Sequence, residues 1–117
     1  MRTIISYGSY YKDFVKTLTK KEIAKLEYVL MLLTTTDKMP TKFVKFIREG
    51  IFELRFEYIG NAYRIFFIFD DDKIVILFNG FQKKTEKTPE NEINKAIKIK
   101  NEYYEYKEKQ RKYDNKH

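Results

Sequence analysis

The fold is decided by residues 51–81, IFELRFEYIGNAYRIFFIFDDDKIVILFNGF, in which three runs rich in apolar residues are separated by two short turns. In the first run, residues 51–58, apolar and charged side chains alternate, which is the period of a strand with one buried face. The connections IGN and DDDK contain the residues that tight turns favour. Because strands joined by such short turns pair most simply with their neighbours in sequence, the stretch predicts an antiparallel meander of three strands.

On the N-terminal side of the meander, the sequence predicts one strand and two helices. The segment RTIISY is rich in β-branched residues and short enough for a strand, and residues 10–18 have the pattern of a short helix. Thr19 and Glu22 have the spacing of a capping box at the start of a second helix. The apolar residues behind this box return to one helical face at Ile23, Leu26, Val29, Leu30 and Leu33. We therefore expect a helical hairpin that packs on the sheet.

The connection between this hairpin and the meander is expected to be a loop. TTTDKMPTK, residues 34–42, combines β-branched and turn residues, and Pro40 disfavours continued helix. We expect at most a half-turn at residues 43–47.

A further helix is expected after the meander. Thr88 and Pro89 have the order of an N-cap and a first helical position. The apolar stripe of this helix is formed by Ile93, Ala96, Ile97, Tyr103 and Tyr104. From about residue 105 the chain is polar and charged, so residues 105–117 are expected to fray or to order on a partner. Residues 1–117 thus predict a single α+β domain with one hydrophobic core: an N-terminal strand and helical hairpin packed on a small antiparallel meander, with a C-terminal helix.

The charge of the chain limits its partners. Lys and Arg outnumber Asp and Glu by 24 to 17, and the formal net charge of +7 favours a polyanion or an acidic protein. The absence of cysteine excludes disulfides and thiolate chemistry and suits a reducing cytoplasm. No run approaches the roughly 18 apolar residues that span a bilayer, so we expect a cytoplasmic protein with no membrane partner.

Most conventional catalytic sets are excluded by residue count. The one histidine, His117, is the final residue and too mobile for a positioned base. The four glycines do not form a nucleotide-binding motif. Asp70, Asp71 and Asp72 lie between two strands, which favours a hairpin turn over a magnesium site. We expect no metal and no cofactor.

What remains is a group of cations on the meander. Arg55 is out of phase with the apolar residues of its strand, and Arg64 lies mid-strand among aromatic rings. An unpaired guanidinium is costly there, so Arg64 needs either a ligand or a carboxylate, for which Glu53 and Glu57 are candidates. Two interpretations stay open: a cross-strand ion pair, or a phosphate-binding surface completed by further lysines and flanked by rings for base stacking. That surface would comprise Arg55, Arg64, Lys83, Lys84 and Lys87, with Tyr58, Tyr63 and Phe81 as the rings.

Residues 50–104 resemble the HigB-like, phage-derived branch of the RelE/ParE toxin superfamily. The resemblance is carried by an E-L-R strand, a Y-R strand, the segment GFQKKTEKTP and a helix that opens with E-I-x-x-A. It implies a RelE-like fold and the toxin of a type II toxin-antitoxin system, in a hetero-oligomer with a helix-turn-helix, HigA-like antitoxin. It also implies a metal-independent, ribosome-dependent endoribonuclease that cleaves mRNA. The resemblance places the functional cations of the family at Arg55, Arg64, Lys83, Lys84 and Lys87.

The sequence departs from this family at two places. Ile51 and Glu53 stand where many relatives have lysines, so the general base is open, with Glu57 and Tyr63 as candidates. Ile99, beside Lys98, stands where many relatives have an arginine.

The chemistry expected from the resemblance needs three functions. Arg55 or Arg64 would hold the nonbridging phosphate oxygens, Lys84 would protonate the leaving oxygen or stabilise charge, and Lys83 and Lys87 would bind the backbone. Two alternatives from other classes are a ParE-like inhibitor of DNA gyrase and a non-catalytic basic RNA-binding adaptor.

Overall fold

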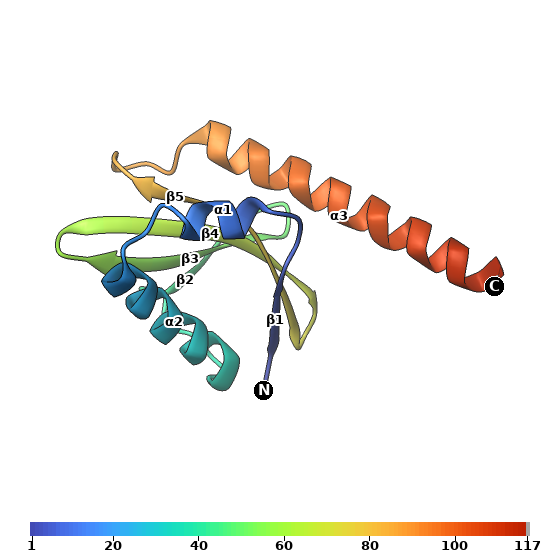
Figure 1. Ribbon diagram of the computed structural model, residues 1–117, viewed down its shortest axis with the longest axis horizontal. Coiled ribbons are helices and arrows are strands. Elements are labelled where there is room, and N and C mark those ends of the chain that lie inside the picture. The colour runs from blue at the N-terminus through green and yellow to red at the C-terminus, as the bar shows by residue number, and fades with distance from the viewer. Residues whose placement is uncertain (117) are drawn as a thin grey trace.

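The computed structural model describes residues 1–116 and the side chains of residues 1–115, so the expectation for His117 lies outside the described residues. It shows an α+β fold built on a five-stranded sheet (Figure 1). The elements follow in the order β1 (Thr3–Ser6), α1 (Tyr10–Val15), α2 (Lys20–Thr35), β2 (Val44–Arg48), β3 (Ile51–Tyr58), β4 (Asn61–Asp71), β5 (Ile74–Lys83) and α3 (Glu90–Lys116). The strand order β1-β5-β4-β3-β2 places β1 and β2 at the two edges.

The predicted meander is confirmed as β3, β4 and β5, which pair antiparallel in sequence order. The sheet is wider than the meander, because β1 pairs parallel with β5 and β2 pairs antiparallel with β3. The expectation of a loop at residues 43–47 is therefore wrong. This short edge strand is half exposed, and its hydrogen bonds come from β3, so its own sequence carries little of the apolar alternation that marks a strand.

The helices α1 and α2 cover one face of the sheet, as expected for the hairpin. The capping box is confirmed: Thr19 accepts a hydrogen bond from the backbone N–H of Glu22, whose carboxylate accepts the N–H of Thr19. A first hydrophobic core lies between these two helices and the sheet. Its buried members are Phe14, Leu26, Val29, Leu33, Leu54, Phe56, Tyr63, Ile65, Phe67, Val75 and Leu77.

The helix α3 covers the opposite face and closes a second core, so the expectation of one core is wrong. Its buried members are Ile51, Phe66, Ile68, Ile76, Phe78, Ile93, Ala96, Ile99 and Tyr103. Because successive residues of a strand point to opposite faces, a strand in the part of a sheet that is covered on both sides buries consecutive residues. Residues 63–68 of β4 are all buried for this reason.

The start of α3 differs in detail from the expected cap. The carbonyl of Pro89 accepts the N–H of Ile93, and the hydroxyl of Thr88 donates to the carboxylate of Glu53 on β3. The predicted cap residue thus ties the segment before α3 to the sheet.

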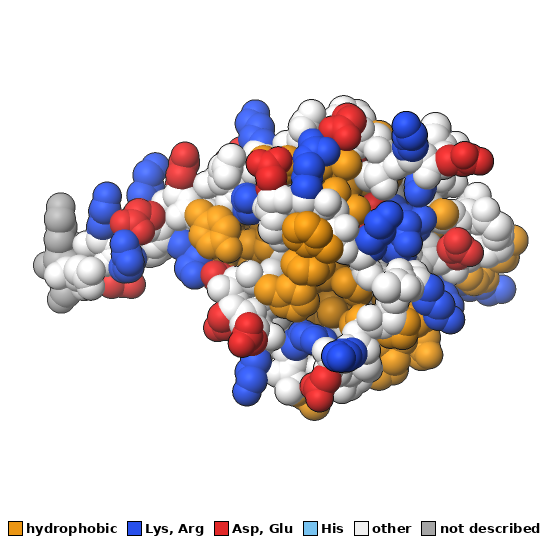
Figure 2. Space-filling view, turned by 180° about the vertical axis from the view of Figure 1, so that it is seen from behind, with side chains coloured by type: hydrophobic (Ala, Val, Ile, Leu, Met, Phe, Trp, Pro, Cys, Tyr) orange, Lys and Arg blue, Asp and Glu red, His pale blue; other side chains and the backbone are white. Residues whose placement is uncertain are grey.

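The far half of α3 projects from the globular part of the molecule (Figures 1 and 2). Tyr103 and Lys107 donate hydrogen bonds of 2.5 and 2.6 Å to the same oxygen of Asp70, which attaches the helix to the end of β4. Residues 105–116 continue as helix, whereas fraying of this tail stays a prediction. Asp71 accepts the N–H of Lys73, as expected for a hairpin turn. None of the helices within residues 1–116 has the length and apolar composition of a membrane span.

Candidate functional site

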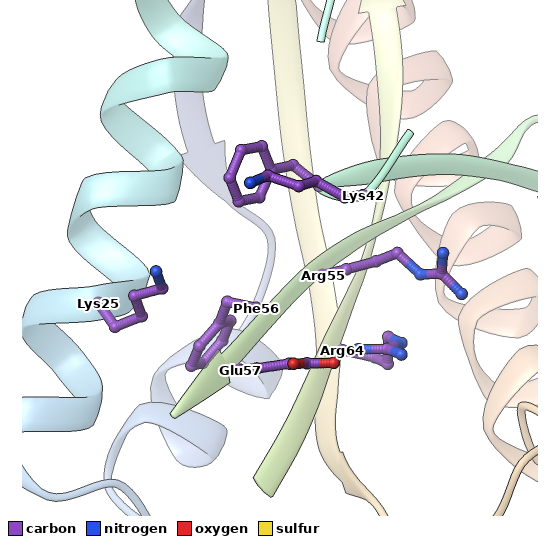
Figure 3. Close-up of a pocket in the computed structure, with 7 residues that line it drawn as sticks. Lys25, Lys42, Arg55, Phe56, Glu57 and Arg64 are labelled. Carbon is purple, nitrogen blue, oxygen red and sulfur yellow. The ribbon is translucent and has the colours of Figure 1, made fainter. Parts of the chain in front are cut away.

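The register of the sheet brings the predicted arginines together. Arg55 of β3 lies directly opposite Arg64 of β4, which lies opposite Phe81 of β5. The next row contains Glu57, Ala62 and Lys83. Residues opposite each other in neighbouring strands share a face, so these cations lie on the face of the sheet that α3 covers, beyond the start of that helix. Figure 3 shows Arg55 and Arg64 extending to the same side of the sheet.

A buried carboxylate lies between the two arginines. Glu53 is fully buried, and its Oε1 accepts a hydrogen bond of 3.0 Å from Arg55 Nε and lies 3.4 Å from Arg64 Nε. Its Oε2 accepts the hydroxyl of Thr88 at 2.9 Å. Of the two candidate carboxylates, Glu53 is thus the one that forms an ion pair with Arg64. One carboxylate shared by two guanidiniums leaves positive charge in excess, so the ion pair and a phosphate-binding surface are compatible.

Arg64 is the more buried of the two arginines, with 8% of its side chain exposed. Nη1 donates to the carbonyl oxygen of Tyr63 at 2.9 Å, and within residues 1–116 Nε makes no hydrogen bond. Burial lowers the pKa of the guanidinium, the charge of Glu53 opposes this, and Arg55 adds to it. Because arginine stays protonated in proteins, this environment makes the binding of an additional anion favourable.

Lys83 belongs to the same group, whereas Lys84 does not. Lys83 is half-buried at the end of β5, and its pKa is lowered by burial, then by the neighbouring charge of Arg64, with Arg55 and Lys45 adding to the effect. Lys84 follows the end of the strand and is exposed. A partly desolvated lysine with a lowered pKa is the better proton donor at neutral pH.

Two hollows meet at Arg55. The first, which we call the loop hollow, has a volume of about 400 Å³ and is lined by Lys45, Phe46, Ile47, Arg55, Lys83, Glu86, Lys87 and Thr88. The second, which we call the edge hollow, has a volume of about 350 Å³ and is lined by Lys25, Lys42, Phe43, Arg55, Phe56, Glu57 and Arg64. The predicted residues Arg55, Lys83 and Lys87 therefore share one concave surface.

The expectation that tyrosines flank this surface is wrong. Tyr63 is buried in the first core, where its ring stacks on Phe56 at 4.9 Å and its hydroxyl donates to Glu22 of α2. Tyr58 packs against the same core. Tyr63 is thereby removed as a general base as well. The signal was present in the sequence, since Tyr58 is in phase with the apolar residues of β3 and out of phase with Arg55.

Phe81 shares the cationic face but is occupied by packing. Its ring lies 5.6 Å from that of Phe66, and it packs against the second core. It forms a wall beside Arg64 in the cross-strand row.

Sequence reasoning missed the cations that come from other elements. Lys45 lies on β2 opposite Glu53, a strand that the sequence did not predict. Lys25 lies on α2 and Lys42 before β2, and only the tertiary fold brings them to Arg55. Within residues 1–116, His, Cys, Asp and Glu form no group of three that could hold a metal ion.

Comparison with known proteins identifies one family for most of the chain. A family model described as "Phage derived protein Gp49-like (DUF891)" matches residues 13–101, which include α2, the four antiparallel strands and the first turns of α3. A comparison with curated proteins gives no match.

Proposed function

The chain belongs to the Gp49-like family of phage-derived proteins, a family associated with toxin-antitoxin systems of the RelE/HigB type, and we propose that it is a HigB-like toxin that cleaves mRNA on the ribosome. The single observation that supports this proposal is the convergence of Arg55, Arg64 and Lys83 from three strands on one face of the sheet, where Arg55 and Arg64 share the carboxylate of Glu53.

The proposed reaction uses the ribose 2′-hydroxyl as the nucleophile. Its oxygen attacks the adjacent phosphorus, the 5′-oxygen of the next nucleotide leaves, and negative charge builds on the nonbridging oxygens. Glu53 holds the Nε of Arg55, and the Nη atoms of Arg55 are the proposed donors to those oxygens. Arg64, which is more buried than Arg55, adds positive charge that stabilises the negative charge on these oxygens. The proposed charge stabilisation therefore uses the two arginines and no metal.

Lys83 is the proposed donor of the proton to the leaving oxygen. Because the pKa of its ammonium group is lowered, Lys83 gives up its proton more readily at neutral pH than an exposed lysine does. This role replaces the assignment of Lys84, which lies past the strand end. Lys87 lines the loop hollow and binds the backbone there.

Glu57 is the proposed general base. Its side chain lies beside Arg64 (Figure 3) and lines the edge hollow, and its charge acts on the Arg64 guanidinium. An ionised carboxylate is a weak base, so the ribosome would contribute by bending the mRNA into the in-line geometry.

The proposed partners are the ribosome with its mRNA and a helix-turn-helix, HigA-like antitoxin. The net charge of +7 favours both a polyanionic substrate and an acidic segment of an antitoxin. We propose that the antitoxin forms a hetero-oligomer with this chain and covers or distorts the cationic surface.

The test is the mapping of transcript 5′ ends after brief expression of the chain without an antitoxin. New 5′ ends inside translated regions are expected for the wild type and not for Arg55→Ala, with Lys98→Ala as a charge-matched control that keeps the cuts. Intact transcripts with damaged chromosomes would support the gyrase inhibitor instead. Uncut transcripts on ribosomes that retain the protein would support the RNA-binding adaptor.

A further inference from the structure

The edge hollow lies where β3 extends beyond its pairing with β2. β2 begins at Val44, opposite Leu54, and the last contact before it is the hydrogen bond of 2.7 Å from Arg55 N–H to the carbonyl of Phe43. Beyond this point, residues 56–58 of β3 form the open edge of the sheet, facing α2. Figure 3 shows Lys25 reaching from α2 toward this edge.

The lining of the edge hollow carries an excess of positive charge. Four of its side chains are cationic and one, Glu57, is acidic. The carboxylate of Glu57 lies beside Arg64 and acts on the charge of that guanidinium. Figure 3 shows the Glu57 side chain pointing away from Lys25.

The two lysines of the hollow are not neutralised by carboxylates. Lys42 Nζ lies 4.8 Å from the centre of the Phe43 ring, and Lys25 Nζ lies 5.6 Å from that of Tyr28. Within residues 1–116, neither lysine forms an ion pair. Contacts with rings hold an ammonium group in place and leave its charge available to an anion.

Two further groups favour an anion at this place. Arg64 lines the hollow, and its side chain is more than nine-tenths buried. Its Nε makes no hydrogen bond within residues 1–116 and lies 3.4 Å from the Glu53 oxygen that Arg55 also contacts, so one carboxylate serves two guanidiniums. The backbone also contributes, because N–H groups two residues apart in a strand point to the same side. The N–H of Glu57 therefore points out of the open edge, as that of Arg55 does toward Phe43.

Arg55 connects the edge hollow to the loop hollow, because it lines both. A strand of RNA carries one negative charge on each nucleotide, so a strand held at Arg55 presents its neighbouring phosphates to the two hollows.

We propose that the edge hollow is a second phosphate subsite for single-stranded RNA, in which Lys25 and Lys42 bind the backbone phosphate next to the linkage held at Arg55. This assignment rests on the proposed function and extends it across the edge of β3. The substrate then crosses the sheet edge between the loop hollow and the edge hollow.

The experiment measures binding separately from cleavage. The probe is a fluorescein-labelled hexanucleotide RNA with 2′-O-methyl groups, which removes the nucleophile, and its dissociation constant is measured by anisotropy at several salt concentrations. The variant Lys25→Ser/Lys42→Ser is compared with Lys109→Ser/Lys112→Ser, which removes the same charge from exposed positions on the projecting half of α3. Circular dichroism confirms that both variants are folded, and Lys25→Arg/Lys42→Arg tests whether charge alone restores binding.

We expect the first variant to bind about tenfold more weakly and its salt slope to fall by about 0.7, since the two lysines bind one phosphate and each phosphate contact with a single strand contributes about 0.7 to the slope. The arginine variant is expected to regain most of the affinity. Equal losses in the two serine variants would overturn the subsite, because the lysines would then act only through net charge.

Cleavage on ribosomes separates the two proposals. If the wild type cuts mRNA while both serine variants bind and cut alike, the subsite is refuted and the proposed function stands. The other outcome is that the salt slope falls as expected from the wild type to Lys25→Ser/Lys42→Ser, while the wild type leaves mRNA intact on ribosomes. In that case the subsite stands and the proposed nuclease function is refuted.

Discussion

Arg55 and Arg64 lie directly opposite each other on β3 and β4, and both guanidiniums reach the same buried oxygen of Glu53. A pair of like charges in cross-strand contact is unfavourable unless an opposite charge lies between them. The carboxylate therefore allows two cations to be held side by side on a rigid sheet, where they form a preorganised site for an anion.

The first prediction concerns the carboxylate itself. Replacing Glu53 by Gln leaves the two guanidiniums without a buried counter-charge, and we expect the free energy of unfolding to fall by about 2–4 kcal/mol. Urea denaturation followed by circular dichroism measures this change. Glu57→Gln, at an exposed position of the same strand, should stay within about 0.5 kcal/mol of the wild type. Equal stability of the Glu53→Gln protein and the wild type would mean that this ion pair does not hold the site together.

The second prediction distinguishes two neighbouring lysines. Lys83 shares the face of Arg55 and has a lowered pKa, whereas Lys84 is exposed past the strand end. In a ribosome-dependent cleavage assay, Lys83→Met should reduce the rate by about 100-fold or more, as expected for the loss of a general acid. Lys84→Met should reduce it by less than about tenfold. The reverse order would restore the sequence-based assignment of Lys84.

The third prediction follows from the pKa of Lys83, which burial and then the charge of Arg64 lower in the folded protein. Below the ordinary lysine pKa, the unfolded chain therefore binds more protons at this site than the folded chain does, and stability rises with pH as this difference is removed. The free energy of unfolding of the wild type minus that of Lys83→Gln should increase between pH 8 and pH 10. Urea denaturation at several pH values measures it. A difference that stays constant or falls across this range would contradict the assigned environment.

The fourth prediction concerns the glycine of the GF segment. A Cβ added to Gly80 would lie 2.5 Å from Cδ2 of Phe14, so Gly80→Ala forces the ring of α1 away from β5. We expect a loss of about 1–3 kcal/mol of stability, in the range of overpacked cores. In a Phe14→Leu background the same substitution should cost clearly less, because the obstructing ring is absent. Additive losses would show that the cost has another source.

Local periodicity explains which elements the sequence predicted. The alternation of β3, the capping box of Thr19 and the apolar face of α2 are each visible within a few residues, and all three are confirmed. β2 was missed because it is a short edge strand whose ring at Phe46 is 55% exposed, so its pairing depends on β3. The second core was missed because an all-apolar run such as residues 65–69 does not reveal how many faces of a sheet are covered.

In the site, too, the features visible within a few residues were predicted, and those that depend on the tertiary fold were not. The need of Arg64 for a ligand or a carboxylate, with Glu53 and Glu57 as candidates, followed from one strand pair, and the strand period already separated Arg55 from Tyr58. Lys25 and Lys42 could not be placed in advance, because they reach Arg55 only through the packing of α2 and the path of the chain before β2.

The parallel pairing of β1 with β5 determines the order in which the nascent chain can fold. Thr3 lies opposite Ile74 and Ser6 opposite Leu77, so β1 is synthesised about 70 residues before its partner exists. During that time β1 and the apolar faces of α1 and α2 lack the sheet that buries them, and such long-range pairing is slow and exposed to aggregation. A chaperone that binds nascent chains would therefore find its best target in the N-terminal third of this protein.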